Sequence, residues 1–253
     1  MKSFISEDNI EQAICNRLSL PEYGWKRIEC DARVEAQDDV STTGRASPSE
    51  CILPDVLFAA LKRLNPKMDE DVLKIILQDL RKDFTGTDMI DTNYSLYQKI
   101  RNGIQVKVRR NGKDDFDIVR LFDFDHPEMN DFHCVNQMWI KGHYRYRRPD
   151  VLLFVNGLPI VFIELKNSTV KIEEAYNKNL TSYRQDIPNI FAFNQICVLS
   201  NGLQTKIGAW NSKYEFFFEW LRVDDEKEKL DREQIAEHGL SIQTLIDGLF
   251  RKE

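Results

Sequence analysis

The chain has 253 residues and a formal net charge of −6, with 30% charged and 42% hydrophobic residues. This length can bury a sizeable core in one large domain, and the composition is typical of a soluble globular protein. The negative charge argues against a whole surface that binds nucleic acid, because phosphate contacts require local Lys and Arg. No apolar run approaches the roughly 20 residues needed to cross a membrane, and the first residues lack the apolar region of a signal peptide. We therefore expect a cytoplasmic protein without a membrane partner.

The cysteines and histidines show no spacing typical of a metal centre. Because Cys-x-x-Cys pairs are absent, we predict reduced core residues at Cys15, Cys30, Cys51, Cys134 and Cys197. Ordinary surface or turn roles are expected for His126, His133, His143 and His238. Zinc and disulfide chemistry are therefore not expected.

The first predicted helix begins at Ser6 or Asp8, either of which can cap it, and ends near Leu18. Its apolar stripe consists of Ile10, Ala13, Ile14 and Leu18. Glu11 borders this stripe, and an acidic residue in a first turn also interacts favourably with the helix dipole. The Ser, Thr, Gly and Pro residues from Ser41 to Ser49 then predict a surface loop.

From about residue 50 to residue 102 the apolar residues follow a helical period. Pro54 suits a first helical position, and a second stripe runs through Val72, Ile75, Ile76 and Leu80. A shorter helix is predicted from about Tyr94 to Ile100. These segments carry no recognisable chemistry, so we interpret them as a helical elaboration packed on one side of a sheet.

The period changes to two after Gly103, which predicts strands. Ile104, Val106 and Val108 alternate with polar residues, and Asn111-Gly112 predicts a turn. The returning strand is expected to direct four side chains to one face, namely Phe116, Ile118, Phe122 and Phe124. A further strand is predicted from about Phe132 to Ile140.

Basic and aromatic residues alternate immediately after that strand. The segment from Lys141 to Arg148 contains Arg145, Tyr146 and Arg147. Such an arrangement can contact a phosphate backbone, which predicts DNA contacts by Lys141, Arg145, Arg147 and Arg148. The alternative is a solvated edge strand.

Two apolar runs, Val151 to Val155 and Leu158 to Leu165, flank Asn156-Gly157 and predict a hairpin. Strand alternation places Phe162, Glu164 and Lys166 on one face. A two-residue loop would pair Asp150 with Ile163 and separate Asp150 from Glu164, whereas an odd loop unites them. We therefore predict an odd loop, with Gly157 left-handed in a bulge after a type I turn.

Asp150, Glu164 and Lys166 together suit phosphodiester hydrolysis. Two neighbouring carboxylates repel each other unless a cation or proton intervenes, and Mg²⁺ favours sparse carboxylate sites that leave it several waters. A lysine can orient the attacking water or stabilise developing charge. The alternative is a half-buried strand that ends in solvated charges.

After this hairpin, a crossover helix is predicted from Asn167 to Arg184, with Asn179 and Tyr183 on one face. Strands are expected at Phe191 to Phe193, Ile196 to Leu199 and Tyr214 to Trp220. The charged stretch from Val223 to Glu233 is expected to be solvated. Ser241 is expected to cap a last helix whose apolar face consists of Ile242, Leu245, Ile246, Leu249 and Phe250.

Pro149-Asp150, the hairpin and Glu164-Leu165-Lys166 resemble the PD-(D/E)xK nuclease motif. The longer text Arg-Pro-Asp-Val…Asn-Gly-Leu-Pro-Ile-Val-Phe-Ile-Glu-Leu-Lys-Asn resembles the amino-terminal nuclease domain of type I restriction enzyme R subunits. This resemblance continues to Ser200-Asn201-Gly202 and covers most of the chain except about residues 35 to 130. It implies one α/β nuclease domain over residues 1–253, a mixed sheet of the restriction-endonuclease-like type flanked by helices, with a helical insertion at about 50–102.

The same resemblance implies a set of site residues. Asp150, Glu164 and the Leu165 backbone carbonyl would bind Mg²⁺, Glu11 would approach the metal, and Lys166 would assist catalysis. In related nucleases a Gln-x-x-x-Tyr motif supports the site. Here Asn179 replaces the glutamine and Tyr183 matches the tyrosine, whereas the alternative is that this helix only packs on the sheet.

Type I R subunits continue into motor domains that translocate DNA with ATP, and no Gly-x-x-x-x-Gly-Lys-Ser/Thr phosphate loop occurs in this chain. The resemblance therefore implies a nuclease-domain fragment that cleaves double-stranded DNA within a complex with methyltransferase and specificity subunits. The alternatives are a DNA-binding or subunit-docking module that does not cleave, and a free-standing repair nuclease.

Overall fold

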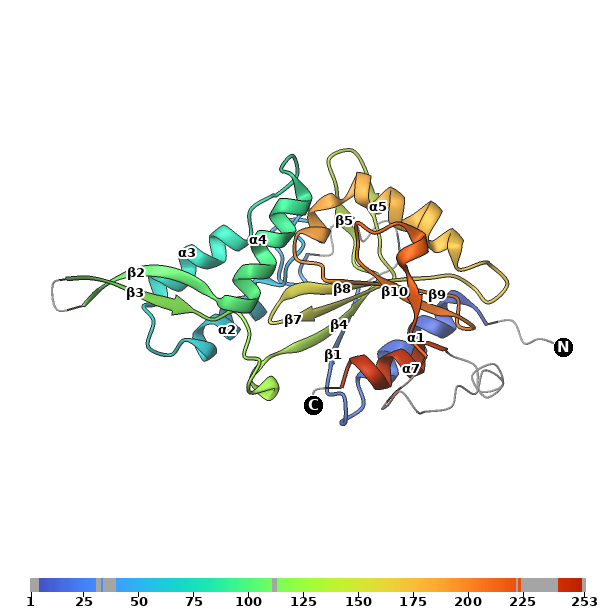
Figure 1. The fold of residues 1–253 in the computed structure, drawn as a ribbon, viewed down its shortest axis with the longest axis horizontal. Coiled ribbons are helices and arrows are strands. Elements are labelled where there is room, and N and C mark those ends of the chain that lie inside the picture. Colours follow the sequence, from blue (N-terminus) through green and yellow to red (C-terminus); the bar gives the residue numbers. More distant parts are fainter. Residues whose placement is uncertain are drawn as a thin grey trace.

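A mixed seven-stranded sheet forms the centre of the computed structural model, which describes residues 5–30, 33, 40–110, 113–221, 223 and 241–251. The strand order is β1-β4-β7-β8-β9-β10-β11, in which the β1–β4 and β8–β9 pairs are parallel and the other pairs antiparallel. The strands are β1 (Lys26–Glu29), β4 (Phe132–Asn136), β7 (Val151–Val155), β8 (Leu158–Leu165), β9 (Ile196–Ser200), β10 (Thr205–Gly208) and β11 (Phe218–Glu219). Helices flank this sheet (Figure 1), which confirms the predicted α/β class.

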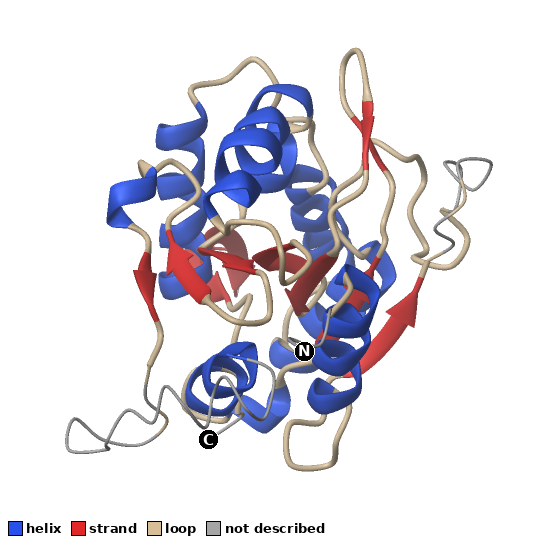
Figure 2. Ribbon diagram, turned by 90° about the vertical axis from the view of Figure 1, so that its right-hand side faces the viewer, coloured by secondary structure: helices blue, strands red, loops and turns tan. Residues whose placement is uncertain are grey.

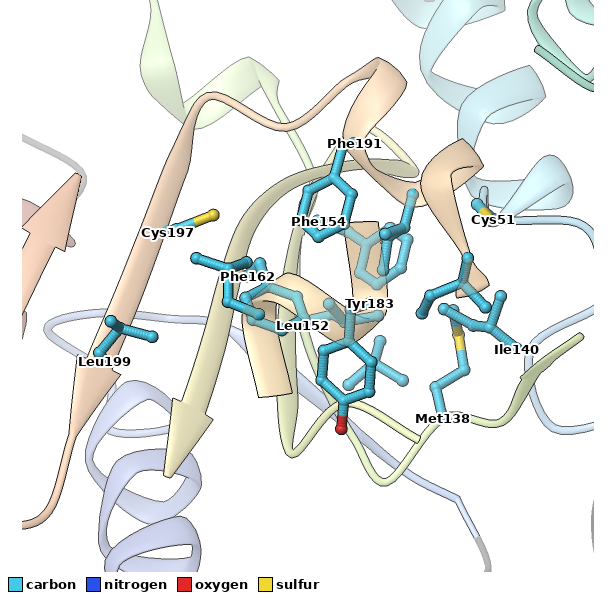
Figure 3. Close-up of a cluster of buried hydrophobic side chains, with 14 of the residues drawn as sticks. Cys51, Met138, Ile140, Leu152, Phe154, Phe162, Tyr183, Phe191, Cys197 and Leu199 are labelled. Atoms are coloured by element: carbon cyan, nitrogen blue, oxygen red, sulfur yellow. The ribbon is translucent and has the colours of Figure 1, made fainter. Parts of the chain in front are cut away.

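Each face of the sheet is covered by its own helical layer (Figure 2). On one face, Ile163 and Leu165 of β8 pack with α1 (Glu7–Leu18) and α7 (Ser241–Leu249). On the other face, Phe162 packs with Tyr183 and Phe191, which lie on α5 (Thr181–Asp186) and the 3-10 helix η4 (Pro188–Ala192) (Figure 3). The predicted alternation along β8 is therefore confirmed.

The first helix forms as predicted. The Ser6 side chain caps α1 by accepting a hydrogen bond from the Asn9 N–H group at 3.2 Å. The last helix is held against α1 and the segment that follows it, because Asp247 accepts hydrogen bonds from Arg17 and Tyr23. These contacts fix the helix that borders the candidate site.

A helical subdomain precedes β4 and has its own apolar cluster. It contains α2 (Pro54–Leu64), α3 (Glu70–Leu80), α4 (Met89–Asn102) and the hairpin β2 (Ile104–Arg110) and β3 (Lys113–Val119). Its core also includes Leu158, so the subdomain packs on the β7–β8 hairpin. The predicted strand to Phe124 is too long, because β3 ends at Val119 and Phe124 is 62% exposed.

Several shorter predictions were wrong in detail. The expected strand Phe191–Phe193 does not form, because Pro188 begins the 3-10 helix η4, which includes Phe191 and ends at Ala192 just before Phe193. Between Tyr214 and Trp220, a 3-10 helix, η5 (Tyr214–Phe216), precedes the two-residue β11. The crossover segment is helical only from residue 173, and its π-helical turn η3 (Ala175–Leu180) follows two α-helical residues. Strands β1 and β10 had not been predicted.

The remaining expectations concern isolated residues and segments. All five cysteines are buried and free, as predicted. The Asn111-Gly112 turn lies outside the described residues, as does nearly all of the stretch from 223 to 233. No helix among the described residues is both long and apolar enough to span a membrane.

Candidate active site

The register of the β7–β8 hairpin brings the two predicted carboxylates together. Val151 pairs with Ile163, and continuing this register by one residue places Asp150 opposite Glu164. The register shifts after Leu153, because Leu153 pairs with Val161 whereas Phe154 pairs with Pro159. Ile160 is thus a bulge residue that supplies the odd residue in the hairpin.

The turn itself is not the one predicted. Val155 pairs with Leu158, so the loop has two residues, and Asn156 (φ 49°) and Gly157 (φ 82°) are both left-handed. These values are typical of a type I′ turn. The expected odd loop was therefore wrong, but the expected shared face is correct because the bulge at Ile160 has the same effect on register.

The turn is clamped by its surroundings. A Cβ atom on Gly157 would lie 2.5 Å from the Leu53 carbonyl oxygen, so only glycine fits this close approach. The Leu53 N–H group donates to the Gly157 carbonyl at 2.9 Å. The buried Asn156 amide donates to the Leu121 carbonyl at 2.8 Å and accepts from the Asp131 N–H group at 2.7 Å. The helical subdomain therefore helps to hold the hairpin that carries the site.

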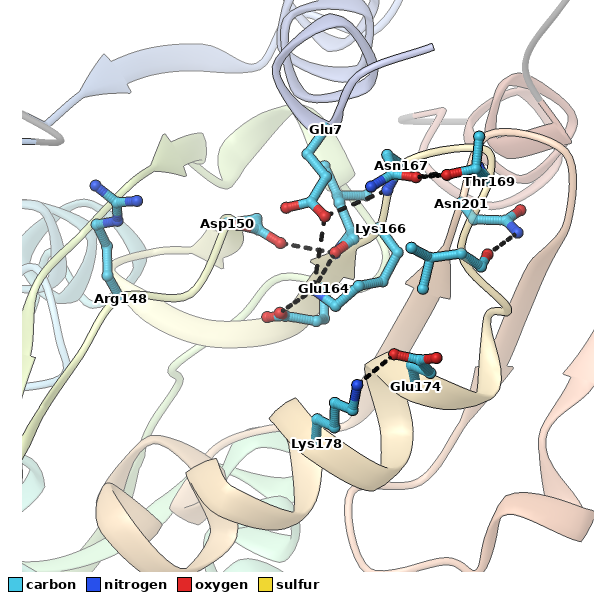
Figure 4. A network of polar contacts seen from close by, with 12 residues as sticks. Glu7, Arg148, Asp150, Glu164, Lys166, Asn167, Thr169, Glu174, Lys178 and Asn201 are labelled. Carbon is cyan, nitrogen blue, oxygen red and sulfur yellow. Dashed lines mark hydrogen bonds and ion pairs between the residues drawn. The ribbon is translucent and has the colours of Figure 1, made fainter. Parts of the chain in front are cut away.

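Glu7, Asp150, Glu164 and Lys166 converge at the end of this hairpin (Figure 4). Asp150 Oδ2 accepts a hydrogen bond from the Leu165 N–H group at 2.7 Å. Lys166 Nζ donates to Glu164 Oε1 at 3.2 Å and to the Leu165 carbonyl oxygen at 2.6 Å. The second carboxylate oxygen of Glu164, Oε2, is buried and has no hydrogen-bond partner among the described residues.

Both carboxyl groups favour a proton or a cation. Burial raises the pKa of Asp150 to about 7, against the opposing effects of the Leu165 N–H bond and Lys166. Burial, followed by the charge of Asp150, raises the pKa of Glu164 well above its ordinary range. Glu164 is 1% exposed, so its charge is poorly solvated. A divalent cation beside these oxygens would satisfy both groups.

The donor set suits a hard cation. Asp150, Glu164 and the Leu165 carbonyl offer only oxygen atoms, and Glu164 Oε2 lacks any other partner. Among the described residues, no three His, Cys, Asp or Glu side chains cluster closely enough to form a metal centre by themselves. A cation here would therefore retain several waters, as Mg²⁺ commonly does.

Glu11 lies near this centre but in a different set of contacts. It is 5% exposed, and its Oε1 accepts a hydrogen bond from Asn136 Nδ2 at 2.8 Å, while its Oε2 accepts one from Gln137 Nε2. Burial raises the pKa of Glu11, and these two hydrogen bonds oppose that rise. Glu11 also lines a cavity of about 670 Å³ together with Asp150 and Arg148. The structure therefore brings Glu11 to the cavity and does not group it with Glu164.

Tyr183 in α5 and Asn179 in η3 belong to the helical layer that covers the Phe162 face of the sheet. Tyr183 is 6% exposed, packs edge-on against Phe162 at 5.5 Å between ring centroids, and donates its hydroxyl to the Arg148 carbonyl at 3.2 Å. Burial raises the pKa of Tyr183, while a side-chain hydrogen bond with Asn179 opposes this rise. Tyr183 therefore packs against the sheet and also supports the segment before Asp150 through a hydrogen bond.

The basic residues before Asp150 occupy different environments. Strands β5 (Ile140–Lys141) and β6 (Tyr146–Arg147) form a small antiparallel ladder, in which Lys141 is exposed, as is Arg145 in the loop that connects the two strands. Arg147 is engaged in an ion pair with Asp186. The guanidinium carbon of Arg148 lies 5.3 Å from the ring centroid of Trp139.

Three residues of this region were missed from the sequence. Glu7 lies 4.0 Å from Lys166 Nζ and accepts the Asn167 N–H group at 3.2 Å. Its position immediately after the capping residue Ser6 gave no signal beyond a favourable first-turn charge. Asn136 and Gln137 are polar residues at the end of a buried strand, a signal that could have identified them.

Comparison with known proteins identifies similar chains. The family model described as "Type I restriction enzyme R protein N terminus" matches residues 4–216. The "Type I restriction enzyme HindI endonuclease subunit" of Haemophilus influenzae is 31% identical over 254 residues, which cover 98% of this chain and 23% of that protein. The "Putative type I restriction enzyme MjaIXP endonuclease subunit" of Methanocaldococcus jannaschii is 32% identical over 228 residues, covering 83% of this chain and 21% of that protein. The chain thus spans less than a quarter of the length of either relative.

Proposed function

This chain belongs to the family of type I restriction enzyme R protein N-terminal domains, and on that premise we propose that it hydrolyses phosphodiesters of double-stranded DNA in a Mg²⁺-dependent reaction. The observation that supports this most strongly is the shared face of Asp150 and Glu164, where a buried Glu164 oxygen has no hydrogen-bond partner in the part of the chain that the structure describes. A purely structural strand end would leave that oxygen unsatisfied, at a cost of about 1–3 kcal/mol.

Each residue of the centre has a separate role in this proposal. Asp150, Glu164 and the Leu165 carbonyl hold the cation, whose contribution is Lewis-acid polarisation of the phosphoryl oxygen. Lys166 already lies within hydrogen-bond distance of Glu164 and Leu165, so its ammonium group can orient the attacking water or stabilise charge on the phosphate. Glu11 is a supporting carboxylate at the cavity wall.

Substrate contacts are assigned to the basic segment beside the cavity. Lys141 on β5 and Arg145 in the β5–β6 loop are exposed and can contact the phosphate backbone, while Arg148 lines the cavity beside Asp150. Arg147 is assigned a DNA contact only if its ion pair with Asp186 opens, and otherwise supports the ladder. Asn179 and Tyr183 support the segment before Asp150.

The rest of the enzyme is inferred from the relatives. The relatives' printed names describe endonuclease subunits of type I restriction enzymes. We propose that the whole protein works in the cytoplasm with methyltransferase and specificity subunits and cleaves after ATP-driven translocation by motor domains. The present residues form one nuclease domain over 1–253, with a helical elaboration at about 50–102.

Replacing Asp150 with asparagine is expected to lower plasmid cleavage by at least about 10³-fold, because loss of several kcal/mol of Lewis-acid stabilisation corresponds to such a factor. The measurement uses the complete endonuclease subunit assembled with its partner subunits, with Mg²⁺, ATP and a circular plasmid. ATP hydrolysis is measured in parallel and should remain within twofold. Unchanged cleavage would refute the nuclease assignment and would support a DNA-binding or subunit-docking function instead.

A further inference from the structure

Gln137, which lies beside the candidate site, has an unusual left-handed backbone conformation. Gln137 and Asn156 are the non-glycine residues with positive φ among the described residues, at 59° and 49°. Asn156 has a clear reason for this conformation, because it forms the type I′ turn, which asparagine tolerates well. Gln137 is in no such turn, so its left-handed backbone requires another explanation.

The side chain of Gln137 provides that explanation. Its amide nitrogen donates to Glu11 Oε2, and its neighbour Asn136 donates from Nδ2 to Glu11 Oε1 at 2.8 Å. Two adjacent residues of an ordinary strand would point to opposite faces. The left-handed conformation at the end of β4 breaks this alternation, which allows both amides to reach one carboxylate.

Gln137 also contacts the metal-binding segment through its backbone. Its N–H group donates to the Asp150 carbonyl oxygen at 3.0 Å. One residue therefore joins α1, through Glu11, to the start of β7, through Asp150. Glu11, Asn136, Gln137 and Asp150 all line the same cavity.

The amide oxygens add a second observation. Asn136 is 1% exposed, and both Asn136 Oδ1 and Gln137 Oε1 are buried without a hydrogen-bond partner among the described residues. Since the nitrogen atoms are committed to Glu11, the oxygen atoms must find donors elsewhere. Buried polar atoms of this kind require an explanation, such as an ordered water or the hydration shell of an ion.

We propose that Asn136 and Gln137 are positioning residues of the nuclease centre, which fix the Glu11 carboxylate and the Asp150 backbone around a hydrated divalent cation. This inference rests on the proposed metal-dependent function. The two amides do not touch the cation in this assignment. They act through Glu11, Asp150 and the water around the cation, as outer partners of metal ligands commonly do.

The test separates folding from metal binding by using Gln137→Gly. Glycine adopts a left-handed backbone without strain, and this gain opposes the loss of the hydrogen bond to Glu11, so the variant should melt near the temperature of the wild type. It lacks the amide, so the affinity for Mn²⁺ should fall about tenfold, which is the usual effect of losing an outer partner. Mn²⁺ binding to the 253-residue chain is measured by calorimetric titration.

Three other variants complete the experiment. Gln137→Asn retains an amide and tolerates positive φ, so its loss of affinity should be smaller than that of Gln137→Gly. Gln12→Ala removes an amide that lines the same cavity but contacts Arg27, and should bind Mn²⁺ within twofold of the wild type. Asp150→Asn should abolish the binding that is being measured.

The outcomes distinguish the two proposals. Wild-type affinity in Gln137→Gly, with binding lost in Asp150→Asn, would overturn the positioning role and leave the metal centre intact. Mn²⁺ binding that survives in Asp150→Asn would remove the proposed centre and, with it, this inference. Weaker binding by a Gln137→Gly chain that melts near the temperature of the wild type is the result expected here.

Discussion

Replacing Glu164 with glutamine is expected to abolish DNA cleavage while stabilising the metal-free chain. Cleavage should fall by about 10³-fold or more, because one of two cation-binding carboxylates is lost. Stability should rise, because a side chain that is 1% exposed exchanges a poorly solvated charge for a neutral amide, while Lys166 is 14% exposed at its side chain and keeps its hydrogen bond to the Leu165 carbonyl oxygen. Carboxylates that repel each other in a functional site commonly lower the stability of the folded chain while they support its activity.

The stability effect should depend on pH in a defined direction. The pKa of Asp150 is raised from 3.8 to about 7, and the pKa of Glu164 also lies above its ordinary 4.5. Between about pH 4 and pH 7 the folded chain therefore binds more protons than the unfolded chain, so its stability falls as pH rises through that window. Thermal melts from pH 5 to pH 8 should show this fall in the metal-free wild type and a shallower one in Glu164→Gln.

The control for this substitution is Glu174→Gln on the same side of the molecule. Glu174 is a solvent-accessible carboxylate whose side chain forms an ion pair with Lys178, and such pairs contribute little to stability because water screens them. Its replacement should change neither cleavage nor the pH dependence of melting. Equal melting curves for Glu164→Gln and the wild type at pH 8 would show that Glu164 is not held in an unfavourable charged state.

Replacing Lys166 with methionine is expected to abolish cleavage too, but to destabilise the chain. The lysine side chain is 14% exposed and provides the hydrogen-bonding cation beside Glu164, which is itself 2% exposed at the side chain. Removing one partner of a buried pair costs about 3 kcal/mol when the other remains charged. Cleavage should fall by about 10²–10³-fold, the usual effect of losing one electrostatic donor.

Lys178→Met is the matched control, because Lys178 pairs with Glu174 on an exposed helix surface (Figure 4). Urea unfolding at pH 8 should show the loss for Lys166→Met and less than about 0.5 kcal/mol for Lys178→Met. The loss of stability in Lys166→Met should shrink as pH falls, because a protonated Glu164 carries no charge for a cation to balance. Equal stability of both variants at pH 8 would contradict the buried pair.

The sequence was sufficient to identify Asp150, Glu164 and Lys166 as candidate site residues, because strand period and residue type are local properties. It also predicted that Asp150 and Glu164 share a face. The reason given was wrong, because Asn156-Gly157 forms a two-residue turn and Ile160 provides the bulge. A bulge depends on packing against neighbouring elements, which two apolar runs cannot reveal.

The contacts of Glu11 also could not be predicted from the sequence. A glutamate on a first helix is ordinary by position, yet here it is buried and accepts hydrogen bonds from Asn136 and Gln137, which lie more than a hundred positions away. The left-handed conformation of Gln137 has no sequence signature, because such conformations usually select Gly, Asn or Asp. Only the tertiary structure brings these three side chains together.

The helical subdomain illustrates the opposite case. Its apolar periodicity predicted α2, α3 and α4 well, since long amphipathic segments give the strongest local signal. Its contact with the site hairpin, through Leu53 and Gly157, could not be predicted from that pattern. The connection matters because it supports the turn that precedes the bulge.

The most direct test of the account is a crystal structure of this chain grown with Mn²⁺, with anomalous scattering used to locate the ion. We expect one peak within coordination distance of an Asp150 carboxylate oxygen, a Glu164 carboxylate oxygen and the Leu165 carbonyl oxygen, with Lys166 Nζ displaced from its present bond to Leu165. Strong Mn²⁺ density elsewhere on the chain, with Lys166 still bonded to Glu164 and Leu165, would contradict the proposed centre.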